Sequence, residues 1–256
     1  IQSSSATTVI VVGLVNAQVL KLRNAIGVIM GANIGTTITA HILRLSDLQT
    51  DNFFLMLLKP KSLAPLAMIV GILFFMSAKR DRQKNIGIIL LGFGVLFTGM
   101  FAMEGAVAPL SNEPWFTSLF ATFRNPVIGI LVGTFVTAAI QSSAASIGIL
   151  QALTSTGLIT YSMAFPIIMG QNIGTCITPI LASIGASKNA KRTAAVHVSF
   201  NVLGTIIFVI GCYTFQHFVG FSFWDAPIDK GGIANFHTIF NVTVTLLFIP
   251  LVGLLE

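Results

Sequence analysis

The sequence has very little charge: Asp, Glu, Lys and Arg make up 9% of its 256 positions, against 54% hydrophobic residues. A soluble domain carries about 25% charged residues, so this composition and a mean hydropathy of +0.89 exclude the soluble class. The length allows about eight membrane-length elements of roughly 20 residues each. We therefore predict an all-α integral membrane protein with several crossings.

Several functional classes lack their signatures in this chain. The two cysteines, Cys176 and Cys212, lie in apolar segments, which favours free thiols over a disulfide. No Ser-His-Asp set, metal-ligand cluster or phosphate-gripping P-loop occurs in the sequence. The net charge of +6 comes from Lys and Arg between hydrophobic runs, where such residues set membrane topology and do not indicate nucleic-acid binding. We expect neither an enzyme nor an organic cofactor.

What the sequence does contain is an internal duplication. Residues 1–6 (IQSSSA) reappear as 140–145 (IQSSAA), and residues 29–39 reappear as 168–178 with nine of eleven positions identical. The offset is 139 residues in both cases. The repeated residues are Gln, Ser, Asn, Gly and Thr within apolar segments. Paired, Gly-interrupted hydrophobic segments in two halves of a chain point to the binding site of a secondary transporter.

The apolar segments fall at 1–20, 24–43, 62–78, 86–103, 126–140, 141–158, 163–184, 193–215 and 233–255. Segments 126–140 and 141–158 are each short for a full crossing, and no charged residue separates them. They predict a re-entrant helical hairpin with Gln141-Ser142-Ser143 at its tip. By the duplication, Gln2 to Ser5 form the tip of an equivalent hairpin, whose first arm we expect to lie outside this chain.

Three crossings separate the two hairpins, so the hairpins enter from opposite faces and the halves form inverted-topology repeats. We assign repeat 1 and its connecting segments to residues 1–125, and the transmembrane part of repeat 2 to residues 126–256. With this topology one face receives nine basic and two acidic residues, and the other receives five basic and six acidic residues. The positive-inside rule then makes the first face, with the C-terminus, cytoplasmic.

The second repeated motif predicts a broken transmembrane helix in each repeat. In Gly31–Thr37 and in Gly170–Cys176, two glycines bracket an asparagine, and each glycine weakens a helix by about 1 kcal/mol relative to alanine. The N–H groups exposed at such a break suit an anion, and the exposed carbonyls suit a cation such as sodium. Because no charged side chain lies at the centre of either segment, an anion would depend on co-bound cations, which predicts obligate coupling. Close helix packing, the alternative explanation of small residues, does not require the repeated Gln and Asn.

A further repeat is His-x-x-Phe-Asn, which begins at His197 and again at His237. One interpretation is a proton-sensitive group or part of an ion pathway. The other, which we favour, is an interhelical hydrogen bond near a membrane interface.

On the paired Gln-Ser-Ser and Gly-x-Asn-Ile-Gly-Thr motifs, the sequence resembles the sodium/phosphate cotransporter family, comprising the type II sodium-dependent phosphate transporters and their bacterial relatives. The resemblance covers nearly the whole chain. It implies sodium-coupled symport of inorganic phosphate across a plasma membrane by alternating access, here resembling the shorter bacterial branch and so a bacterial inner membrane. The chain departs from the pattern at Ala144 and Cys176, which leaves repeat 2 with fewer hydroxyls than repeat 1.

The resemblance also implies the ligand-binding residues and partners. The expected substrate-binding residues are Gln2, Ser3, Ser4, Ser5, Asn33, Thr36, Thr37, Gln141, Ser142, Ser143, Asn172 and Thr175. The expected sodium ligands are Gln2, Ser4, Thr7, Asn33, Gln141, Ser143 and Asn172. Further expected partners are the lipid bilayer, a second copy in a homodimer, and a cytosolic regulatory domain after Glu256. Two alternatives stay open: a sodium-coupled transporter of another oxyanion or a small carboxylate, and a non-transporting phosphate sensor or scaffold.

Overall fold

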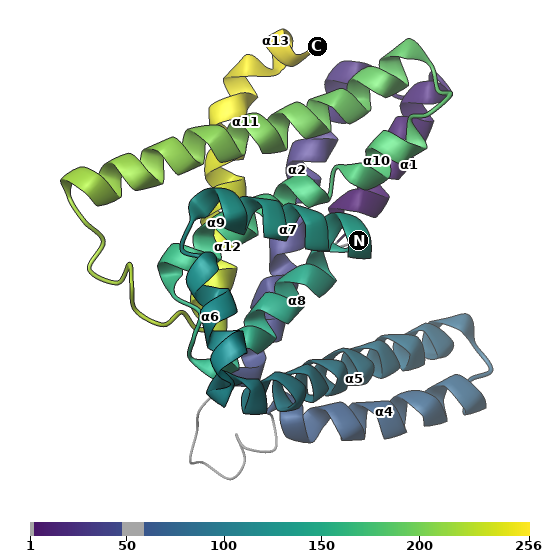
Figure 1. Cartoon of the computed structure of the whole chain (residues 1–256). Helices are drawn as coiled ribbons and strands as arrows, with labels where there is room; N and C mark the ends of the chain where they lie inside the picture. The colour runs from purple at the N-terminus through teal and green to yellow at the C-terminus, as the bar shows by residue number, and fades with distance from the viewer. Residues whose placement is uncertain (1–2, 48–58) are drawn as a thin grey trace.

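A computed structural model describes residues 3–47 and 59–256, and these residues form a bundle of helices (Figure 1). Six helical segments are long and apolar enough to cross a membrane: Leu22–Asp47, Pro60–Ser77, Asp81–Asn112, Tyr161–Ala182, Lys188–Phe218 and Lys230–Leu254. The protein is therefore an all-helical, multi-pass membrane protein, as its composition predicts.

The described helices match the predicted apolar segments closely, and the short η1, η2 and α6 are those not anticipated by the sequence. In chain order they are α1 (Ser4–Asn16), α2 (Leu22–Leu43), η1 (Arg44–Asp47), α4 (Pro60–Ser77), α5 (Asp81–Val107), η2 (Ala108–Asn112), α6 (Pro114–Thr122), α7 (Pro126–Ile140), α8 (Ser143–Leu153), η3 (Thr154–Thr156), α9 (Tyr161–Gly174), α10 (Ile177–Ala182), α11 (Lys188–Phe218), α12 (Lys230–Phe248), η4 (Ile249–Leu251) and α13 (Val252–Leu255).

Helices α7 and α8 form a hairpin whose turn is the Gln-Ser-Ser motif. Gln141 ends α7 in the left-handed conformation (φ 58°), and the Ser142 hydroxyl accepts the Ala145 N–H at 3.2 Å as the N-cap of α8. With 15 and 11 residues, the two arms rise about 22 and 16 Å, less than the roughly 30 Å of a bilayer core. This length supports a re-entrant hairpin, which stays a prediction.

The first repeat has the same local structure at its motif. Ser3 is the N-cap of α1 with φ −130° and ψ 105°, compared with −139° and 109° at Ser142. Its hydroxyl accepts the Ala6 N–H, again at 3.2 Å. The duplicated sequence therefore specifies a duplicated helix start.

The predicted helix break is confirmed in the second repeat and wrong in the first. Helix α2 continues through Asn33 without interruption, whereas a turn at Thr175 and Cys176 separates α9 from α10. The physical reason lies at Pro179, which has no N–H to donate to the Thr175 carbonyl four residues earlier. The equivalent residue of the first repeat, 139 positions earlier, is Ala40, which preserves the helix.

Three glycines bring α7 unusually close to α9. A Cβ at Gly133 would overlap the Ile167 carbonyl oxygen, and a Cβ at Gly170 would overlap that of Ile130. At Gly174 a Cβ would come within 2.6 Å of the Thr134 carbonyl oxygen. This backbone contact holds the first arm of the second hairpin, and so its tip, against the interrupted helix of the same repeat.

We expect Gly170→Ala to destabilise the protein, because the added methyl group meets a backbone atom that cannot rotate away. Overpacking of this kind costs about 1–3 kcal/mol. Gly27→Ala on α2 is the matched control, since nothing lies within 4 Å of its Cβ position and alanine is the better helix former. Thermal unfolding in detergent should show a lower midpoint for Gly170→Ala alone. Equal midpoints for the two variants would contradict the close-contact argument.

Helix α2 lies between the helices that follow the two Gln-Ser-Ser motifs. It packs against both α1 and α8, and also against α11 and α12. Helix α1 in turn contacts α10 and α11, while α8 contacts α5, α7, α9 and α12. The α4–α5 pair projects to one side (Figure 1) and packs on the rest of the bundle through α5 and α8. The motif-bearing segments are thus gathered around α2.

Candidate functional site

A group of buried polar side chains without partners lies where α1 packs on α2. Ser4 and Asn33 are each 1% exposed and Ser5 is 6% exposed. Neither serine hydroxyl, nor either polar atom of the Asn33 amide, has a hydrogen-bond partner in residues 3–47 and 59–256. A buried polar group left unpaired costs about 1–3 kcal/mol. Several such groups on two packed helices therefore indicate a site for a ligand.

The two repeats meet beside this group. The Thr36 hydroxyl of α2 lies 3.2 Å from the hydroxyl of Ser143 at the start of α8, and both side chains are buried. One residue comes from the Asn-Ile-Gly-Thr motif of repeat 1 and the other from the Gln-Ser-Ser motif of repeat 2. The structure thus brings a hairpin tip of one repeat to the second motif of the other.

Ser4 and Ser143, one from each Gln-Ser-Ser motif, also lie at helix N-termini. The first N–H groups of a helix have no acceptor within the helix, and the N-cap hydroxyls of Ser3 and Ser142 satisfy only one N–H each, at Ala6 and Ala145. The other early N–H groups, beside Ser4 and Ser143, carry the positive end of the helix dipole. Such helix starts are suited to an anion such as phosphate.

The other predicted site residues use their polar groups within their own helices. The Asn172 amide donates to the Ile168 carbonyl at 2.9 Å, and the Thr175 hydroxyl donates to the Asn172 carbonyl at 2.6 Å. The hydroxyls of Thr7 and Thr37 donate to Ser3 and Ile34 carbonyls, each at 2.8 Å. The two copies of the motif are therefore unequal: Asn33 is free to bind a ligand, and its counterpart Asn172 is partly engaged.

Neither motif glutamine is seen in the buried group of Ser4, Ser5 and Asn33. The Gln141 side chain is exposed, and its backbone forms the turn of the hairpin. Gln2 lies outside the described residues. The replacement of Ser5 by Ala144 in repeat 2 has a local reason, because Ala144 lines a cleft between α5 and the hairpin in which Ser142 is the only polar residue.

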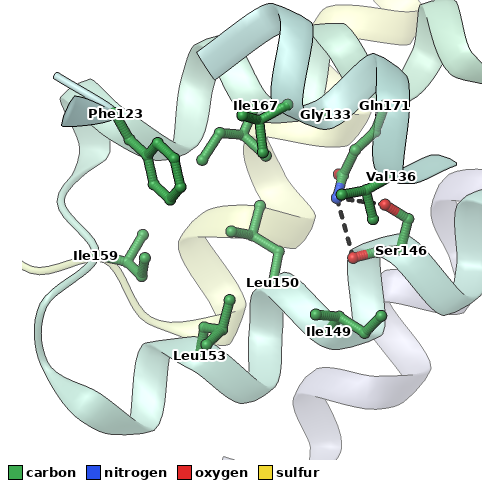
Figure 2. A pocket seen from close by; sticks show the side chains of 11 residues that line it. Phe123, Gly133, Val136, Ser146, Ile149, Leu150, Leu153, Ile159, Ile167 and Gln171 are labelled. Carbon is green, nitrogen blue, oxygen red and sulfur yellow. Dashed lines mark hydrogen bonds between the residues drawn. The ribbon is translucent and has the colours of Figure 1, made fainter. Parts of the chain in front are cut away.

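A second polar contact fixes the hairpin to α9. Gln171 donates from its amide to the carbonyl and the hydroxyl of Ser146, at 2.9 and 2.8 Å (Figure 2). Thr137 of α7 donates to the same hydroxyl at 2.8 Å. The adjoining cavity of about 70 Å³ is lined mainly by apolar side chains such as Ile149, Leu150 and Ile167 (Figure 2). Gln171 and Ser146 therefore position the tip, and this cavity is unsuited to a charged ligand.

Comparison with known proteins identifies relatives over the whole chain. The profile of the Na+/Pi-cotransporter family matches residues 1–105 and 98–224. The chain belongs to the Na+/Pi-cotransporter family. This membership agrees with the resemblance of the repeated motifs and supports phosphate transport.

Individual relatives of this Na+/Pi-cotransporter family member are bacterial and mammalian. The uncharacterized protein YqeW of Bacillus subtilis is 35% identical over 99% of this chain and 78% of its own length. The putative inorganic phosphate export protein YjbB of Escherichia coli is 26% identical over 98% of this chain, which spans 44% of that protein. The rat sodium-dependent phosphate transport protein 2A is 34% identical over 46% of this chain and 20% of its own length. No solved structure matches.

Sequence reasoning about this family member missed a buried cation. The Lys230 ammonium, 4% exposed, lies 2.7 Å from carboxylate oxygens of both Asp47 and Glu104, and it donates to the Ser46 hydroxyl at 2.7 Å. Gln151 of α8 donates to the Lys230 and Ala40 carbonyls, each at 3.0 Å. The signal in the sequence was a lysine at the start of an apolar helix, but its partners are more than a hundred residues away. This cluster joins α12, η1, α5 and α8 at one end of the bundle.

We expect Lys230→Met to lower stability markedly, since it leaves two carboxylates side by side without a cation. Removing one partner of a buried ion pair costs about 3–5 kcal/mol, and the partial exposure of Asp47 and Glu104, 42% and 21%, places the expected loss at the lower end. Thermal unfolding of the purified protein measures it. The double variant Lys230→Met/Glu104→Gln should recover much of the loss, because one of the two carboxylates is then neutral. Additive losses in the double variant would contradict this account.

Proposed function

We propose that this protein carries out sodium-coupled symport of inorganic phosphate by alternating access between its two repeats. The observation that carries the proposal is the unpartnered group Ser4, Ser5 and Asn33 beside the Thr36–Ser143 contact. It combines helix N-termini for an anion with free oxygens for a cation. It also draws on both repeats, so a relative movement of the repeats would change the site.

The electrostatics favour coupling to a cation. Of the Lys and Arg side chains described, Lys230 is the only one that is buried, and it is engaged by Asp47 and Glu104. A phosphate dianion at the site would therefore be held by neutral dipoles alone. Because burying a charge without compensation is strongly unfavourable, bound sodium ions are the natural compensation.

The direction and the location of transport form part of the proposal. We propose the plasma membrane, a bacterial inner membrane, with the C-terminus cytoplasmic, on the asymmetry of basic residues between the two faces. With an inward sodium gradient a symporter moves phosphate inward. The name of the Escherichia coli relative describes phosphate export, so outward phosphate movement is the second candidate.

Purified protein in liposomes, with labelled phosphate, tests the proposal in both directions. A sodium gradient into the vesicles should drive phosphate accumulation, and a reversed gradient should drive phosphate release. Sulfate and a small dicarboxylate, added as competitors, separate phosphate from the other anions. Saturable phosphate binding without any flux would favour the sensor or scaffold, and flux independent of sodium would overturn the coupling.

A further inference from the structure

The repeated His-x-x-Phe-Asn element is part of a longer pattern in the structure. Each copy continues by one helical turn to a threonine, giving His, Asn and Thr at spacings of four on one helix face. The α11 stripe is His197, Asn201 and Thr205, and the α12 stripe is His237, Asn241 and Thr245. All six side chains are buried within the bundle, between 0% and 6% exposed. Two polar stripes therefore run along the buried faces of α11 and α12.

The free atoms of these stripes are mostly acceptor oxygens. The Asn201 and Asn241 amides donate to the carbonyls of His197 and His237, at 2.9 and 2.8 Å. Because a carbonyl only accepts, this fixes the amide nitrogen toward the helix and turns each Oδ1 away from it. Neither Oδ1, nor the hydroxyl of Thr205 or Thr245, has a hydrogen-bond partner among the described residues.

The hydrogen-bond partners also correct the interpretation of the histidines that the sequence favoured. Neither ring nitrogen of His197 has a hydrogen-bond partner within the described part of the chain. The interhelical hydrogen bond expected from the sequence is therefore wrong for His197. An interhelical contact is made by Asn201 of the same element, whose amide donates to Cys176 Sγ at 3.5 Å.

The α12 stripe lies against the motif of repeat 1. His41 is 2.9 Å from the Thr238 hydroxyl, and Arg44 donates to Asn235 at 3.0 Å. These contacts set an antiparallel register in which Thr245 comes level with Ile34 on α2, next to Asn33. On α2, Asn33, Thr37 and Arg44 share one face; on α12, Thr238, Asn241 and Thr245 do so. Extended along the packed pair α2 and α12, this register directs Asn241 and Thr245 toward the part of α2 that carries the unpartnered Asn33.

The α11 stripe lies against the interruption of repeat 2. The Asn201 amide lies 3.5 Å from Cys176 Sγ, and that thiol lies 3.6 Å from the His197 carbonyl oxygen. The two stripe helices cross where the space beside Gly204 is filled by Val244. Thr205 and Thr245 each follow that contact by one residue.

We infer that Asn241 and Thr245 of α12, with Asn33 of α2, bind a sodium ion. Neutral amide and hydroxyl oxygens are ligands suited to a hard cation. The amide nitrogens of both stripes already donate within their own helices, so the stripes offer few hydrogen-bond donors to an anion. Asn33 has a free donor as well as a free acceptor, so its Nδ2 can contact an anion while its Oδ1 contacts the cation. The inference rests on the proposed function and names the coupling-ion site within it.

The test compares Thr245→Val, which removes one oxygen at nearly constant volume, with Thr243→Val two residues away on another face of α12. The half-saturating sodium concentration for phosphate uptake should rise about tenfold in Thr245→Val, the loss of one ligand interaction. It should stay unchanged in Thr243→Val. Asn241→Leu should show a larger rise than Thr245→Val.

A binding readout on the purified full chain keeps the site and the transport function apart. Sodium chloride should raise the wild-type thermal midpoint above that in potassium chloride at equal ionic strength, and Thr245→Val should lose most of this difference. Wild-type sodium dependence in Thr245→Val, in both measurements, would overturn the site and leave the symport intact, with a buried water as the occupant. A wild-type protein that shows no sodium dependence in uptake or in unfolding would overturn both the symport and the site.

Discussion

Phosphate affinity should fall about 100-fold when potassium replaces sodium at constant ionic strength. The site contains no free Lys or Arg side chain among the residues described, so sodium supplies the positive charge that a phosphate dianion requires. A coupling of this size lies within the range observed between two ligands of one protein. Phosphate binding to purified protein at about pH 8, where phosphate is mostly divalent, provides the measurement.

Two controls make this result specific. Binding coupling is reciprocal, so phosphate should raise the affinity for sodium by the same factor. Potassium provides equal screening of long-range charge, which separates an occupied site from a general salt effect. Equal phosphate affinities in the two salts would remove the symport mechanism.

Ser4→Ala and Ser143→Ala should each reduce sodium-dependent phosphate uptake strongly, with little loss of folded protein. A hydrogen bond to a charged ligand contributes about 1.5–3 kcal/mol, which corresponds to a reduction in affinity of roughly 10- to 150-fold. The Ser4 hydroxyl is buried and has no partner in residues 3–47 and 59–256, so its removal from the empty protein costs no hydrogen bond within that part of the chain. We therefore expect the thermal midpoint of Ser4→Ala without ligand to equal or exceed that of the wild type.

Ser146→Ala provides the contrast. The Ser146 hydroxyl accepts hydrogen bonds from Gln171 and Thr137. Its loss leaves the Thr137 hydroxyl unpaired, at about 1–3 kcal/mol, and leaves Gln171 with only the Ser146 carbonyl. This variant should lose stability before ligand is added, whereas Ser4→Ala should not. Normal uptake in both Ser4→Ala and Ser143→Ala would count against ligand binding at the hairpin tips.

Much of the fold was readable from the sequence because the signals that specify it are local. Hydropathy located the helices, and the Gln-Ser-Ser motif marked the end of α7 and the start of α8. Capping explains this accuracy, because the Ser142 hydroxyl interacts only with a backbone N–H three residues away. The same local rule operates at Ser3.

The helix is interrupted at the second Asn-Ile-Gly-Thr motif and continuous at the first. The cause is local, but it lies outside the motif itself. Two glycines weaken a helix by about 1 kcal/mol each, which packing of α2 against four helices overcomes. Pro179 removes a hydrogen bond that packing cannot restore. The break therefore occurs in the repeat that contains the proline. Pro179 lies three residues beyond the motif in repeat 2, and repeat 1 has no proline at the equivalent position.

The membrane class, the duplication, the helices and the candidate residues could all be read from the amino-acid sequence. Which of these residues are free to bind a ligand depends on how the helices pack. Asn33 and Asn172 occupy equivalent positions in near-identical motifs, yet Asn33 has no partner among the residues that the structure describes and Asn172 donates within its own helix. Lys230 reaches Asp47 and Glu104, and Thr36 reaches Ser143, through the register of packed helices. That register depends on side-chain packing between segments distant in sequence, which no local pattern encodes.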